Sequence, residues 1–431
     1  MTDEFDAHAD RRSAHLYATD AQFRDTAPLD AVTEAIRRPG PPLAALVATV
    51  MEGYADRPDL GERATEPVTD PDTGRTTLRL LERFDMLTYG ELRERAGAVA
   101  SEWRHHPEHA LEPGEFVAVL GPASAVYIVV DLACVRSGAV SVPLQAGASA
   151  EHLAPMVEQT GPRLLVAHID HLEVAVEPAA NAPSLGRIIV MGHRTEVTTQ
   201  QEERDSARDR GVALDTPASV IDRGRTLPSL PQVPDGSSAD ALSALIYTSG
   251  STGLPKGAMY TERPVRQFWV DFVPGQGVRP SIALNYLPLS HMTGRGMLFG
   301  TLAKRGSRLL RGVQRSVDAL RGPLPGPAHR VSSWFPASPT CSSSTTAPSC
   351  PAGPGRVAVH ASAPPSAATT AFVEDCLRLR LLDGYGSTEG GIVSLDGRVL
   401  RPPVTDHKLA DVPELGHFGT DSPRPRGELL I

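Results

Sequence analysis

The most regular pattern of apolar and polar positions lies between residues 114 and 144. Two apolar runs, at 115–120 and 139–144, flank an apolar-faced stretch that starts at Ser124 and ends at Arg136. Serine is a favoured helix N-cap, and Gly138 can take the left-handed conformation that often follows a helix. The pattern therefore predicts a strand, a helix and a second strand in a βαβ unit.

Four further short apolar runs predict buried strands. They lie at residues 163–167, 187–191, 242–247 and 282–287. Because helical or polar segments separate them, they predict an α/β fold with a largely parallel sheet. Residues 193–240 are polar and interrupted by proline and glycine, which predicts a surface excursion and not a domain.

Residues 307–356 do not follow this pattern. Within them, residues 331–350 consist largely of Ser, Thr, Pro and Ala and contain two of the four cysteines. A natural linker can have this composition, and so can coding sequence translated in the wrong frame. The orderly pattern returns sharply at about residue 357, which favours the second interpretation and predicts weak packing across the segment. The chain is thus divided into residues 1–306, 307–356 and 357–431.

The composition limits the class of protein. A chain of 431 residues has room for two or three packed units, and its 41% hydrophobic residues can bury a core. No stretch approaches the ~20 consecutive apolar residues of a membrane span, and the first residues are acidic, so we expect a cytoplasmic protein. Four cysteines without CxxC spacing indicate neither a disulfide framework nor a zinc site. A net charge of -9 gives no reason to expect nucleic-acid binding.

The sequence YTSGSTGLPKG at residues 247–257 carries the strongest candidate chemistry. Its glycines let backbone N–H groups approach an anion, its hydroxyls add donors, and Lys256, one of only three lysines in the chain, supplies positive charge. It does not match the Walker pattern, because Gly257 stands where a magnesium-binding serine or threonine would follow the lysine. We interpret it as a phosphate-binding loop; a flexible surface loop is the alternative. The residues of this predicted loop are Thr248, Ser249, Gly250, Ser251, Thr252, Gly253 and Lys256.

This loop resembles the signature of the adenylate-forming, or AMP-binding, superfamily. LTYGEL at 87–92 and ACVRSGAVSVPL at 133–144 look like its early structural motifs, and DGYGSTE at 383–389 looks like its adenine and magnesium motif. Within the superfamily, four stretches are similar to the amino-terminal domain of carboxylic acid reductases. They are residues 16–23, 51–58, 287–295 and 401–430, and the likeness covers residues 11–306 and about 357–431.

The resemblance implies the layered α/β core of the adenylate-forming fold with largely parallel sheets, here incomplete. It implies ATP-dependent activation of a small carboxylic acid as an acyl-adenylate with Mg²⁺. In carboxylic acid reductases this is the first step of reduction to an aldehyde, through a thioester on a phosphopantetheine carrier domain and an NADPH-dependent reductase domain. The alternatives are an acyl-CoA ligase, a peptide-synthetase adenylation domain, or a fragment that does not turn over.

The resemblance also assigns roles to single residues. Glu389 is expected to hold Mg²⁺, which prefers oxygen ligands, and Thr388 is expected to donate to the α-phosphate. Tyr385 is expected to lie against the adenine ring. His291, in LPLSHMTGR at 287–295, is expected to line the acid pocket and orient the substrate carboxylate near the α-phosphate. The further nucleotide contacts implied are Asp383, Gly384 and Ser362, the last in ASAP at 361–364 where the family has Gly-Ser-Ala-Pro.

Two functional residues of the family are expected beyond this sequence: an aspartate on the ribose hydroxyls and a lysine that neutralises the reacting groups. Asp421 is not that aspartate, because in the family the stretch like RGELL at 426–430 precedes it. We expect a full reductase to continue with a mobile cap, the carrier domain and the reductase domain, none of which this sequence contains.

Overall fold

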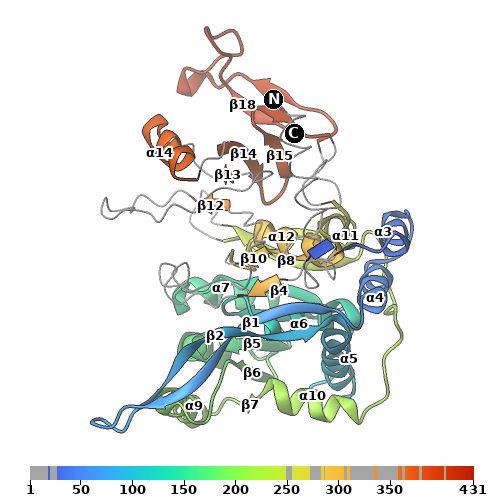
Figure 1. The fold of residues 1–431 in the computed structure, drawn as a ribbon, viewed down its shortest axis with the longest axis vertical. Helices are drawn as coiled ribbons and strands as arrows, with labels where there is room; N and C mark the ends of the chain where they lie inside the picture. The colour runs from blue at the N-terminus through green and yellow to red at the C-terminus, as the bar shows by residue number, and fades with distance from the viewer. Residues whose placement is uncertain are drawn as a thin grey trace. The chain divides into compact units, whose positions relative to one another are not determined.

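The computed structural model divides the chain into two compact units. The larger contains Leu16–Phe272 and Val278–Arg330, and the smaller contains Met1–His15, Val273–Gly277 and Val331–Ile431. Each unit is described by itself (Figure 1). The structure describes residues 18–19, 27–248, 255–271, 283–285, 287–304, 308–310, 334–336, 358–361, 365–377, 381–401 and 404–431.

A seven-stranded sheet in the order β7-β6-β5-β3-β4-β8-β9 forms the centre of the larger unit. Its strands are β3 Phe116–Leu120, β4 Val140–Leu144, β5 Leu164–His168, β6 Arg187–Met191, β7 Leu214–Asp215, β8 Leu242–Thr248 and β9 Lys256–Thr261. All neighbouring pairs are parallel except β8 and β9. The predicted α/β class with a largely parallel sheet is confirmed, and the predicted strands at 163–167, 187–191 and 242–247 correspond to β5, β6 and β8.

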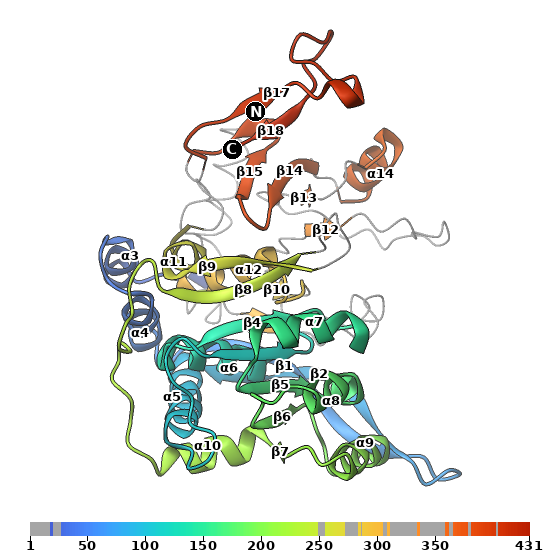
Figure 2. The same cartoon turned by 180° about the vertical axis from the view of Figure 1, so that it is seen from behind.

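Helices surround the sheets of the larger unit, and five of them connect the strands from β3 to β8 along the chain (Figure 2). They are α3 Asp30–Arg37, α4 Leu43–Gly53, α5 Tyr89–His105, α6 Ala125–Ser137, α7 Ala150–Thr160, α8 Leu172–Ala180, α9 Thr198–Asp209, α10 Pro217–Arg225, α11 Glu262–Asp271 and α12 Met292–Ala303, with a 3₁₀ turn η1 Ile169–His171. The apolar side chains of β3, β4, β5 and β6 pack with those of α7 and α8 in one continuous core.

The predicted βαβ unit is β3, α6 and β4. The hydroxyl of Ser124 accepts a hydrogen bond from the Tyr127 N–H at 3.2 Å, which caps the start of α6. Gly138 follows the helix with a φ of +74° and donates its N–H to the Cys134 carbonyl. Both capping residues therefore act as their sequence positions predict.

A second sheet in the larger unit has the order β10-β11-β1-β2. Its strands are β1 Pro58–Thr69, β2 Thr76–Thr88, β10 Ala283–Asn285 and β11 Arg308–Leu310, so the run at 282–287 does contain a strand. The antiparallel pair β1–β2 extends as a long arm (Figure 1). Where β2 ends, Thr88 and Glu91 form a capping box that starts α5, which gives the LTYGEL stretch a structural role.

Residues 193–240, predicted as a surface excursion and not a domain, belong to the larger unit but contain regular elements that the sequence did not predict. They contain α9, the edge strand β7 and α10, and β7 pairs with β6 through Ile188 and Leu214. Polar composition concealed these elements because α9 is largely solvent-exposed and β7 has only two residues, of which Leu214 packs against the core and Asp215 forms ion pairs.

The smaller unit contains the five-stranded sheet β12-β13-β14-β15-β16 and the pair β17-β18. Its elements are β12 Trp334–Pro336, β13 Ala358–Ala361, α14 Ala367–Leu377, β14 Leu381–Ser387, β15 Gly391–Leu395, β16 Arg398–Val399, β17 Lys408–Ala410, η2 Pro413–Leu415 and β18 Glu428–Leu430. Within the anomalous segment 307–356, only 308–310 and 334–336 are described, so its predicted weak packing lies outside the described residues.

Candidate functional site

The predicted phosphate loop connects β8 to β9 in the larger unit. Thr248 ends β8 and pairs in register with Lys256, the first residue of β9, and its hydroxyl donates to the Lys256 carbonyl at 3.4 Å. The Lys256 side chain is exposed. Loops that leave the carboxyl ends of parallel strands are common ligand sites in α/β folds. The five loop residues between them in the prediction lie outside the described residues: Ser249, Gly250, Ser251, Thr252 and Gly253.

His291 stands at the N-cap of α12, at the end of a tight turn. Its N–H donates to the Pro288 carbonyl at 3.3 Å. A Cβ at Gly294 would lie 2.2 Å from that same carbonyl oxygen, so only glycine permits this approach of the helix to the turn. His291 is exposed at this N-cap, but the protein around its ring removes part of its water, and this desolvation lowers the pKa of the imidazole. The ring is therefore neutral near pH 7, which suits a group that hydrogen-bonds to a substrate.

The motif at 383–389 occupies β14 and the turn that follows it in the smaller unit. Asp383, Gly384 and Tyr385 are successive residues of β14, and the Tyr385 side chain is 50% exposed. The Ser387 hydroxyl accepts from the Gly390 N–H at 2.9 Å, which fixes the turn that carries Thr388 and Glu389.

Glu389 is exposed on this turn and makes no hydrogen bond or ion pair with a described residue. No cluster of three or more His, Cys, Asp or Glu side chains that could hold a metal occurs in the described part of the chain. Mg²⁺ is commonly held by one or two carboxylates together with substrate phosphates and water. A single available carboxylate therefore fits a nucleotide-bound Mg²⁺ better than a cation held by the protein alone.

Ser362 lies outside the described residues, but its neighbour in sequence does not. Ala361 ends β13 and pairs in register with Gly384 of β14. His360 likewise pairs with Asp383. Ala361, the last described residue before Ser362, therefore lies beside the strand that carries the predicted adenine contacts.

The described site residues are divided between the two units. Thr248, Lys256 and His291 belong to the larger unit, and the 383–389 motif belongs to the smaller one.

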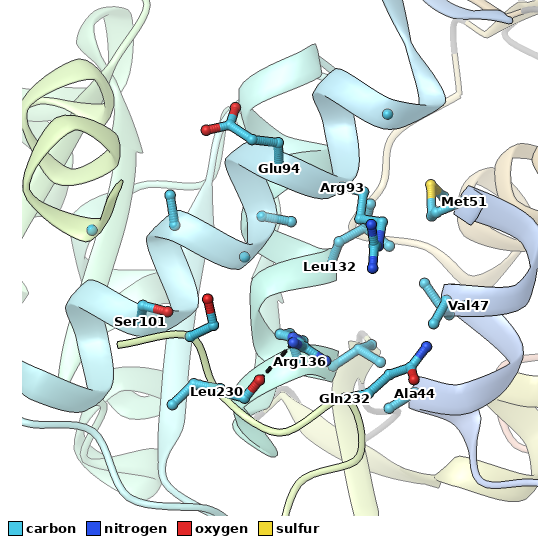
Figure 3. Close-up of a pocket in the computed structure, with 18 of the residues that line it drawn as sticks. Ala44, Val47, Met51, Arg93, Glu94, Ser101, Leu132, Arg136, Leu230 and Gln232 are labelled. Carbon is cyan, nitrogen blue, oxygen red and sulfur yellow. Dashed lines mark hydrogen bonds between the residues drawn. The ribbon is translucent and has the colours of Figure 1, made fainter. Parts of the chain in front are cut away.

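A pocket of about 390 Å³ in the larger unit lies elsewhere, between α4, α5, α6 and residues 224–232 (Figure 3). None of the predicted site residues lines it. Its Arg93 pairs with Glu52 at 2.6 Å, and the Arg136 guanidinium donates to the Leu230 carbonyl at 2.6 Å. These cationic side chains are engaged within the protein, so the pocket offers no evident chemistry for adenylation.

Sequence reasoning missed a buried polar group beneath His291. Arg295, one turn along α12, pairs with Asp131 of α6 at 2.9 Å, and their side chains are 4% and 3% exposed. Arg295 is visible in the sequence as the last residue of LPLSHMTGR. The sequence does not indicate, however, which acidic residue an arginine in an apolar helix pairs with. The hydroxyl of Ser290, also missed, is buried without a hydrogen-bond partner among the described residues.

Comparison with known proteins defines the family. Residues 70–431 match the family of AMP-binding enzymes. A carboxylic acid reductase of Mycobacterium tuberculosis is 45% identical over 460 aligned positions, which cover 99% of this chain and 39% of that protein. The chain thus spans about two fifths of the length of this relative.

Two solved structures match closely. The adenylation domain of carboxylic acid reductase from Segniliparus rugosus, in complex with AMP and a co-purified carboxylic acid, superposes with a TM-score of 0.85 at 38% identity, covering 97% of this chain and 72% of that one. The corresponding domain from Mycobacterium chelonae gives 0.85 at 36% identity, covering 97% and 69%.

The chain therefore belongs to the AMP-binding enzyme family, and its fold is that of the adenylation domain of carboxylic acid reductases. The predicted kinship is confirmed, and it favours the reductase interpretation over the acyl-CoA ligase and peptide-synthetase alternatives. Among the described helices, none has the length and hydropathy required to cross a membrane.

Proposed function

We propose that this chain binds ATP and a small carboxylic acid and joins them as an acyl-adenylate, as the adenylating part of a carboxylic acid reductase. A carboxylate oxygen attacks the α-phosphorus, the bond from that phosphorus to the bridging oxygen breaks, and pyrophosphate leaves. The carboxylate, a poor electrophile, becomes a mixed anhydride. The AMP and carboxylic acid bound to the Segniliparus relative support this assignment.

The observation that carries the proposal is the hairpin of β14 and β15. It presents an exposed aromatic ring at Tyr385 and, four residues later, the carboxylate of Glu389, which has no partner among the described residues. An exposed aromatic face can stack on a base, and a carboxylate on a rigid turn can hold Mg²⁺ beside phosphates. When bound, Mg²⁺ would neutralise charge on the phosphates as pyrophosphate departs.

The larger unit supplies the complementary groups in this proposal. Lys256 and the hydroxyls and N–H groups of residues 248–253 hold the β- and γ-phosphates. His291, neutral at pH 7, donates a hydrogen bond to the substrate carboxylate and orients it toward the α-phosphorus. Holding two anions in line lowers the barrier chiefly through alignment and charge compensation.

The steps that would follow adenylation in a full-length reductase would take place on domains outside this sequence, and they enter the proposal only as context. A carrier domain with a phosphopantetheine thiol would take the acyl group, and an NADPH-dependent domain would reduce the thioester. A structure of adenylation and carrier domains together is known for the Segniliparus relative. Because these steps use ATP and NADPH, we propose a cytoplasmic location.

Exchange of labelled pyrophosphate into ATP, dependent on added carboxylic acid, tests the adenylation step. We expect Glu389→Gln to reduce exchange at least about 100-fold, in the range seen when one charge-stabilising group is removed. Glu414→Gln, an exposed glutamate on η2 of the same unit, is the matched control and leaves exchange unchanged.

Calorimetric titration with ATP and Mg²⁺ separates the alternatives. Nucleotide binding without exchange would indicate a binding fragment, and no binding at all by the folded chain would contradict the proposal.

A further inference from the structure

A buried polar network ties the turn that carries His291 to the centre of the sheet. The Arg295 guanidinium donates from Nη2 to Asp131 Oδ1 at 2.9 Å and to Ser141 Oγ at 3.1 Å. Ser141, on β4, donates in turn to the same Asp131 oxygen at 2.8 Å. Three elements, α12, α6 and β4, thus meet at one ion pair that water does not reach.

The same guanidinium also holds the turn directly. Arg295 Nε donates to the carbonyl of Leu289 at 2.8 Å, in a contact that is fully buried. Leu289 is two residues before His291, and its own side chain is 1% exposed. One planar group therefore fixes both the ion pair and the backbone that leads into His291, which an ammonium on a flexible stem cannot do.

We infer that Arg295 is a positioning residue: its fork to Asp131, Ser141 and the Leu289 carbonyl sets where the His291 imidazole stands. This inference depends on the proposed role of His291 toward the acid substrate. Stability alone does not require a buried ion pair, because apolar residues of similar volume at the same positions often give a protein that is equally stable. The link from Nε to Leu289 supplies the additional reason for an arginine.

Arg295→Lys tests this, because it keeps a cation beside Asp131 and removes the fork. We expect the folded variant to lose about 10- to 100-fold in kcat/KM for the acid in pyrophosphate exchange, the cost of displacing a positioning group by roughly 1 Å. We expect the KM for ATP to stay unchanged. The His291 imidazole, followed by NMR in histidine-labelled protein, should show its pKa rise toward the ordinary value as the turn loosens and water enters.

A second variant covers the case in which Arg295→Lys does not fold. The pair Arg295→Met and Asp131→Leu removes both charges together and keeps the buried volume, so it avoids an uncompensated charge. It also removes the link to Leu289, and it should move the His291 signal in the same direction. Arg187→Lys is the matched control: it alters a buried ion pair elsewhere in the unit and should leave the His291 pKa unchanged.

The outcomes separate this inference from the proposed function. If His291→Gln lowers acid-dependent exchange but folded Arg295 variants leave both the acid KM and the His291 pKa unchanged, the positioning role is wrong and adenylation stands. If the Arg295 variants shift the His291 pKa while His291→Gln leaves exchange intact, the turn is held by Arg295, but His291 does not serve the reaction. If both respond, and a variant that combines His291→Gln with Arg295→Lys loses no more exchange than His291→Gln alone, the inference is supported.

Discussion

Glu102 is the centre of a buried ion network, and its neutralisation gives the sharpest test of stability. Glu102, on α5, is 1% exposed. Its Oε1 accepts from Arg187 Nη1 at 3.0 Å and from Arg223 Nη2 at 2.6 Å, and its Oε2 accepts from Arg187 Nη2. Asp215 of β7 contacts the same two arginines. The network therefore joins α5 and β6 to the segment 193–240.

Glu102→Gln leaves Arg187 buried with Asp215 as its remaining carboxylate, at 2.7 Å. Breaking a buried pair by removing one partner costs about 3–5 kcal/mol, and because Asp215 stays we expect the lower end, about 3 kcal/mol. At about 2–4 °C per kcal/mol, the melting temperature of the larger unit should fall by about 6–12 °C.

Thermal unfolding followed by calorimetry measures this change. Glu66→Gln is the control, because Glu66 pairs with Arg79 on the exposed arm with side chains 37% and 66% exposed. Exposed pairs contribute about 0–1 kcal/mol, so this variant should melt within about 4 °C of the parent. Equal shifts of the melting temperature in the two variants would refute the reasoning that burial of the Glu102 network raises its contribution to stability above that of an exposed pair.

Three further predictions follow from the described residues. Gly294→Ala should lower both stability and acid-dependent exchange, because the new Cβ would lie 2.2 Å from the Pro288 carbonyl oxygen; an unchanged melting curve would contradict this. Burial alone would raise the pKa of Asp215, but hydrogen bonds from Arg223 and the Thr216 N–H lower it below its ordinary 3.8. The stability it contributes is therefore present above pH 3.8 and lost as the pH falls through its folded pKa, so an Asp215→Asn chain should show a flatter loss of stability in acid titration. Burial raises the pKa of the Cys134 thiol, which should react with iodoacetamide only after unfolding; rapid labelling of folded protein at this cysteine would be the contrary result.

Local capping chemistry explains why part of the fold was predictable. Ser124 and Gly138 bound α6 where the sequence places them, because one supplies an acceptor for a free N–H and the other tolerates a φ of +74°. The arm of β1 and β2 was not predicted, since β2 is largely exposed, the end of β1 is exposed too, and neither strand alternates regularly between buried and exposed positions. Without one buried face, the sequence has no period of two to detect.

The candidate site divides in the same way. The glycine- and hydroxyl-rich pattern predicted a loop that includes Thr248 and Lys256, and the structure has these two residues at the end of β8 and the start of β9. The sequence could not predict the network around Arg295, because Asp131 and Ser141 are 164 and 154 residues away in sequence. Such long-range polar pairs depend on the packing of whole elements, which no local pattern encodes.

A crystal structure of the chain with Mg²⁺ and a non-hydrolysable ATP analogue would test most directly whether both motifs bind one nucleotide. We expect Lys256 Nζ within hydrogen-bond distance of the β- or γ-phosphate, Tyr385 against the adenine and Glu389 bound to the Mg²⁺ on the same molecule. A nucleotide that contacts only one of these two segments, or that binds elsewhere on the protein, would contradict the proposed function.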